Sequence, residues 1–183
     1  MSGEFGATAW GHDWLRLAEP TSITRPDPAL PRARSLARGD RVRDLELTPG
    51  QVTAVVDDRG ERRVRITVPT WDDAQVGRAR VVLADQPAGA DLPDTVHAAL
   101  RDAGLPLAPD PATLTTTCGC TSRKDPCLHL LATYVELARR LDERPRHAVV
   151  LRGLTDSGTP RGTARVPLGL VDPVTFYGPS RVR

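Results

Sequence analysis

The alternation of apolar and polar residues between positions 41 and 68 predicts three antiparallel strands. They cover residues 41–47, 52–56 and 62–68, and turns rich in Pro, Gly and Asp separate them. In the third segment, apolar residues at every second position alternate with Arg63 and Arg65. A strand with that pattern buries one face and leaves the other in water. We therefore expect a three-stranded meander with arginines on its solvent face.

Apolar residues at helical spacing predict two helices, one before these strands and one about 60 residues after them. Trp10, Trp14 and Leu17 recur at the spacing of one helical face, so we expect a short helix docked on the core. Residues 127–141 contain no Gly or Pro, and their apolar residues form a continuous stripe on a helix.

Four shorter segments carry weaker patterns. Residues 32–38 and 93–103 are expected to form helices, the first of them ending at Gly39. Residues 76–83 and 147–154 fit either a strand or a short helix. The high content of Pro (17) and Gly (15) indicates long connections, and we expect an α+β fold with short helices.

One short stretch holds all three cysteines of the chain. Cys118 and Cys120 stand two apart, so an extended backbone directs both sulfurs to one face. Cys127 is expected just before the long helix, with His129 in its first turn. Three thiols and an imidazole are the ligand set of a closed, tetrahedral structural zinc site. We expect these four residues to bind one structural Zn²⁺.

Two other interpretations of this stretch compete with zinc. The cysteines could be buried core residues beside an unrelated surface histidine, or Cys118 and Cys120 could form a redox dithiol. Three cysteines within ten residues, and none elsewhere, favour a metal.

A site with four protein ligands leaves no position for a reactive water. The chain also lacks the His-Glu-x-x-His pattern of metalloproteases and a phosphate-binding loop, so we expect no enzyme and no small-molecule substrate.

The order Cys-x-Cys, six residues, Cys-x-His resembles the SWIM-type zinc finger. The opening residues 5–14, with Phe-Gly and Trp-Gly pairs, and the block 33–56 are similar to actinobacterial SWIM zinc finger proteins. The resemblance covers roughly residues 5–151. It implies that a β-rich region precedes the finger, that the same four residues bind zinc, and that the protein is an accessory partner of a Swi/Snf-type helicase. In many members the loop carries an aromatic residue, which residues 121–126 lack, and a basic residue stands where this chain has Leu128.

The charge pattern suggests nucleic acid, DNA rather than RNA, as a partner. The net charge is only +2, and five Asp between residues 85 and 110 make the middle of the chain acidic. Basic residues gather on the finger and near residue 38, and the candidates for phosphate contact are Arg123, Lys124, Arg139, Arg140, Arg34, Arg38 and Arg41. The competing interpretation is a solvated charged face. The alternative function is a protein–protein adaptor whose finger helix docks on a partner protein without nucleic-acid contact.

These features divide the chain into four segments. Residues 1–31 hold the Trp-containing helix and a Pro-rich linker, and residues 32–112 form a small α+β region with the meander. Residues 113–145 form the zinc finger, and residues 146–183 form a short packing segment and a flexible basic tail. The odd number of cysteines, with no signal peptide and no apolar run that could cross a membrane, leads us to expect a cytoplasmic protein.

Overall fold

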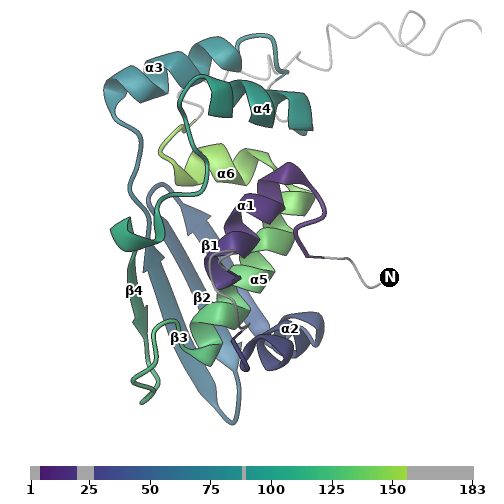
Figure 1. Cartoon of the computed structure of the whole chain (residues 1–183), viewed down its shortest axis with the longest axis vertical. Coiled ribbons are helices and arrows are strands. Elements are labelled where there is room, and N and C mark those ends of the chain that lie inside the picture. The colour runs from purple at the N-terminus through teal and green to yellow at the C-terminus, as the bar shows by residue number, and fades with distance from the viewer. Residues whose placement is uncertain (1–4, 20–26, 88–89, 156–183) are drawn as a thin grey trace, which may run out of the picture.

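The computed structural model describes residues 5–19, 27–87 and 90–155. Residues 156–183, which include most of the flexible tail expected within residues 146–183, lie outside the described residues, as do residues 20–26 of the Pro-rich linker. Within the described part, the chain is α+β, as predicted: a four-stranded antiparallel sheet with helices packed on one of its faces (Figure 1).

The sheet extends the predicted meander by one strand. The strands β1 (Val42–Thr48), β2 (Gln51–Asp57) and β3 (Glu61–Thr67) follow each other through tight turns. The strand β4 (Thr115–Cys118) returns from far along the sequence and pairs antiparallel with β3. Its register sets Cys118 opposite Val64. The strand expected before the cysteines is therefore an edge strand of the same sheet.

The imperfect alternation of β1 comes from a β-bulge. The pairing with β2 shifts register between Arg43 and Glu46, and Asp44 adopts a left-handed backbone with φ of 51°. A bulge inserts one extra residue and breaks the two-residue period locally. Aspartate tolerates this conformation better than most residues.

The helix α5 (Leu128–Glu143) is the centre of the helical layer. Eleven of its sixteen residues are buried, and it packs against the sheet, against α1 (Ala9–Ala18) and against α2 (Leu30–Arg38) (Figure 1). The predicted start of the helix is confirmed, because Cys127 is its N-cap residue and His129 lies in its first turn.

The predicted docking of the first helix is confirmed in detail. Trp10 and Trp14 are fully buried and contribute to a single hydrophobic core that includes α5. The two helices approach closely at Gly11, where an added Cβ would lie 2.5 Å from the carbonyl oxygen of Ala138. Such a contact is shorter than any real Cβ makes, so only glycine fits at this crossing.

One carboxylate anchors the beginning of α1. The backbone N–H groups of Ala7 and Thr8 donate to Asp142 at 3.0 and 2.9 Å, and the Thr8 hydroxyl donates to it at 2.7 Å. Thr8 is also the N-cap of α1. Asp142 thus connects the last turn of α5 to the first turn of a helix more than 130 residues away in sequence.

Residues 76–83 and 147–154, which fit either a strand or a short helix in the sequence, both contribute to helices in the structure. The helix α3 (Asp73–Val82) begins with a capping box between Asp72 and Gln75, and α6 (Arg146–Leu151) follows α5 after Pro145. The predicted helix at 93–103 is α4 (Asp94–Asp102), and a single 3₁₀ turn, η1 (Pro111–Thr113), leads into β4.

The four segments expected from the sequence share one hydrophobic core wherever the structure describes them. No helix among the described residues is both long and apolar enough to span a bilayer.

Replacing Asp142 by Ala should destabilise the fold. Three hydrogen bonds to a charged acceptor are lost, and two backbone N–H groups at the start of α1 lose their partner. We expect a decrease of about 2–3 kcal/mol in the free energy of unfolding, measured by denaturant titration. Asp91→Ala is the matched control, because Asp91 is exposed. Equal stability of the two variants would contradict the anchoring role.

Candidate metal centre

The four predicted ligands converge at the junction between β4 and α5. Cys118 ends β4, and its side chain lies on the helix-covered face because its partner Val64 is buried there. The backbone N–H of Gly119 donates to the Arg63 carbonyl at 3.0 Å, which extends the ladder past the strand and directs Cys120 to the same side. Cys127 and His129 come from the start of α5.

The distances among the ligand atoms fit a tetrahedral ion. One ligand atom from each of the four residues lies within 4.8 Å of the other three. His129 Nδ1 lies 3.6 Å from Cys118 Sγ and 4.0 Å from Cys127 Sγ. Tetrahedral zinc with bonds of about 2.0–2.3 Å has edges of roughly 3.5–3.8 Å between ligand atoms. A small contraction of the cluster would therefore complete the coordination sphere.

The electrostatics of the cluster suit a cation. Burial, followed by hydrogen bonding to Cys120 and the charge of Cys127, raises the pKa of the Cys118 thiol to about 12. Burial lowers the pKa of His129, and the charges of Arg62 and Arg32 lower it too, against the opposing effect of Asp58. The imidazole is therefore neutral at pH 7, with a lone pair for a metal. A bound cation would replace the protons of the thiols.

A second layer of contacts surrounds the histidine. His129 Nε2 is buried and has no hydrogen-bond partner among the described residues, and Asp58 Oδ2 lies 3.7 Å away from it. Asp58 is itself held in place, because its Oδ1 accepts a hydrogen bond from Arg32 Nη2 at 2.5 Å. A negative charge this close to Nε2 favours the tautomer that carries its proton there, which would leave Nδ1 free to face the thiols. Asp58 lies in the turn between β2 and β3, and no local signal in the sequence marks its approach to α5.

The basic residues predicted for nucleic-acid contact do not form one free strip. Lys124 is ion-paired with Asp27 at 2.6 Å, and Arg41 with Asp57 at 2.9 Å. The two candidate arginines of α2 also have partners. Arg34 forms an ion pair with Glu19, and the guanidinium of Arg38 lies 5.6 Å from the centre of the Phe5 ring.

The two arginines of the finger helix are also engaged. Arg139 and Arg140 both bind the carboxylate of Glu136, at 2.6 and 3.0 Å. Glu136 is only 1% exposed, so these contacts neutralise a buried charge. Arg123, in the loop between the cysteine pairs, is exposed and makes no hydrogen bond or ion pair with the part of the chain that the structure describes.

The chain is similar to an uncharacterized protein of Mycobacterium tuberculosis, Rv2102. The two are 29% identical over 160 residues, which cover 82% of this chain and 57% of Rv2102. The chain thus spans little more than half the length of this relative. No known protein family matches the chain, and no solved structure matches it.

Zinc stoichiometry tests the ligand set. We expect one zinc per chain in the wild type, measured by elemental analysis after dialysis, and loss of that zinc in Cys127→Ser and in His129→Ala. His12→Ala is the control, because His12 is exposed on α1 and should not affect binding. With free zinc a thousandfold above its dissociation constant, chelation should also lower the free energy of unfolding by about 4 kcal/mol. Retention of a full equivalent of zinc by Cys127→Ser would refute the assignment.

Asp58→Ala should weaken zinc binding without removing a ligand. Loss of the carboxylate beside Nε2 frees the imidazole to rotate or change tautomer, and we expect a 10- to 100-fold increase in the zinc dissociation constant. The measurement is competition with a chromophoric chelator. Asp57→Ala is the matched control, because the neighbouring Asp57 pairs with Arg41 instead. An unchanged constant in Asp58→Ala would show that Asp58 does not position His129.

Proposed function

We propose that the protein is a non-catalytic binding module stabilised by one structural zinc ion. The convergence of Cys118, Cys120, Cys127 and His129 within 4.8 Å carries this proposal. Zinc is the favoured ion because three thiolates and an imidazole form its usual structural ligand set. The four side chains would hold the start of α5 against the end of β4.

The same ligand set supports a role without catalysis. Four protein ligands fill a tetrahedral site and leave no position for water or substrate. When bound, the ion would supply charge and geometric constraint. The chain's own residues would then hold the loop between the two cysteine pairs in one conformation.

We further propose that this loop takes part in binding nucleic acid, in the setting of a helicase-like ATPase partner. The support comes from Arg123, which is exposed beside the metal centre, and from the resemblance of the Cys-x-Cys and Cys-x-His pairs to SWIM-type fingers. DNA remains our favoured ligand. Zinc removal would release the loop and so weaken binding.

The burial of α5 counts against the adaptor alternative. A finger helix that docks on a partner protein needs a free apolar face, and α5 directs its apolar residues into the core of its own chain. Its exposed positions carry arginines that are already paired with Glu136 and Glu143.

Fluorescence anisotropy with zinc-loaded protein and labelled DNA tests the proposal. We expect binding that weakens steeply as salt is raised, with a negative slope of log affinity against log salt concentration, because phosphate contacts release counterions. Chelation of the zinc should weaken the binding. Absence of binding at low salt, from a protein shown to hold one zinc, would contradict the nucleic-acid proposal and leave the metal centre in place.

A further inference from the structure

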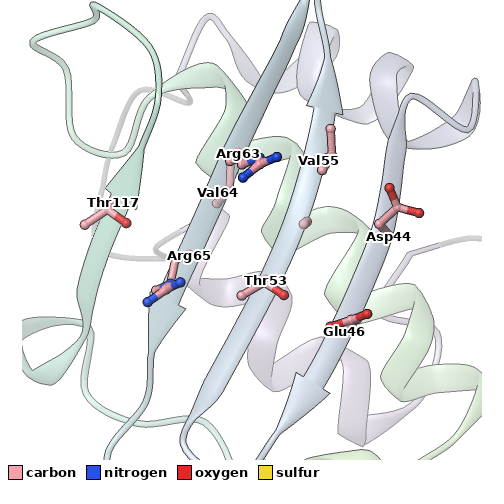
Figure 2. Close-up of a pocket in the computed structure, with 9 residues that line it drawn as sticks. Asp44, Glu46, Thr53, Val55, Arg63, Val64, Arg65 and Thr117 are labelled. Atoms are coloured by element: carbon pink, nitrogen blue, oxygen red, sulfur yellow. The ribbon is translucent and has the colours of Figure 1, made fainter.

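The face of the sheet opposite the helices is uncovered by any described helix and carries a shallow hollow of about 430 Å³ (Figure 2). Residues of all four strands line it. Arg63 and Arg65 project from β3, and Thr117 projects beside them from β4. Asp44 and Glu46 lie across the hollow on β1. The face is therefore divided into a basic half and an acidic half.

The two arginines of the basic half are available for a ligand. Both side chains are exposed, and neither guanidinium group makes a hydrogen bond or an ion pair within residues 5–19, 27–87 and 90–155. Most other arginines of the sheet and of α2 have partners: Arg43 pairs with Glu61, and Arg32 with Asp58. Among the described arginines of the sheet and α2, those with a free guanidinium group therefore lie on the outer side of β3.

The chemistry of this half fits phosphate groups. Guanidinium groups bind phosphate through paired hydrogen bonds, and the hydroxyls of Thr53 and Thr117 flank them as further donors. Arg63 and Arg65 are two residues apart along β3, which separates them by roughly 6.6 Å. Phosphates rise about 3.4 Å per nucleotide along one strand of a duplex, so the two arginines reach different phosphates.

The strands of this face have no aromatic side chain on which bases could stack. The strands β1 to β4 contain no Phe, Trp or Tyr. Proteins that bind single strands without sequence preference stack the bases on such side chains. A surface with arginine and threonine donors alone favours the duplex, whose phosphates are denser and whose bases are already stacked.

The basic half is continuous with the metal centre. Arg63 accepts the backbone hydrogen bond from Gly119, the residue between the first two cysteines. The loop that carries Arg123 therefore begins beside Arg63. Asp44 and Glu46 limit the basic area on the other side, because their carboxylates repel phosphates.

We propose that the β3–β4 half of the open sheet face, with Arg63, Arg65 and Arg123, binds the phosphate backbone of double-stranded DNA without reading its sequence. This inference rests on the proposed nucleic-acid function and relocates its contact surface from the finger helix to the sheet.

The test uses the zinc-loaded full chain, short labelled duplexes of two unrelated sequences, and a single strand of equal length, each in a salt series. Arg63→Gln/Arg65→Gln should weaken duplex binding equally for both sequences. It should also make the log–log salt slope shallower by about 2, since each lost phosphate contact removes about 0.9. Circular dichroism confirms that the variants fold.

Two control variants sharpen the result. Arg16→Gln/Arg78→Gln removes the same charge from exposed positions on α1 and α3, and should leave the slope unchanged. Asp44→Asn/Glu46→Gln removes the acidic border and should strengthen duplex binding.

The possible outcomes separate the two proposals. Wild-type binding to duplex with an unchanged slope in Arg63→Gln/Arg65→Gln would overturn the assignment to the sheet and leave nucleic-acid binding in place. If the wild type bound the single strand more tightly than the duplex, or bound polyglutamate as tightly as the duplex, double-stranded DNA would be overturned as the ligand of this face. No binding by the wild type would refute the proposed function itself, and this inference with it.

Discussion

The burial of α5 is the constraint on which the rest of this structure depends. The helix packs on all four strands and on α1 and α2, so the sheet and the helical layer meet through it. Glu136 lies on the buried side of this helix, and Arg139 and Arg140 neutralise its charge by binding the carboxylate. The first turn of the same helix supplies two of the four candidate metal ligands. Metal binding at that end and Asp142 at the other would together fix the helix along its length.

Much of this arrangement is encoded locally and can be derived from the sequence. The two-residue period of β3 and the helical spacing of Trp10 and Trp14 reflect burial of one face, which the structure confirms. The cysteine and histidine positions indicate a candidate metal site because ligand chemistry restricts which residue types can hold a metal together. The placement of Cys127 before the helix follows from helical geometry alone, since residues two apart cannot share a helical face.

The features that the sequence did not reveal are those that arise between distant segments. The pairing of β4 with β3 joins residues about 50 apart, and no periodicity specifies it. The helix α3 buries only Ala79, so its apolar pattern is weak and only the capping box at Asp72 marks its start. Which arginines are free depends on acidic residues brought near by the fold, as with Arg34 and Glu19. Counting basic residues in the sequence therefore overstates the positive charge that a ligand can reach. The positions of the unpaired arginines are known only from the structure.

The close crossing of α1 and α5 also has a consequence for the order of events during synthesis. The N-terminal helix carries two large indole side chains, and the helix on which they dock begins at Leu128, more than 110 residues later. At typical elongation rates this delay is on the order of ten seconds. During that interval the ribosome would present a nascent chain with Trp10 and Trp14 still lacking their binding surface. The meander, whose contacts are nearer in sequence, would have time to assemble first, and the earliest helix made would be among the last to dock.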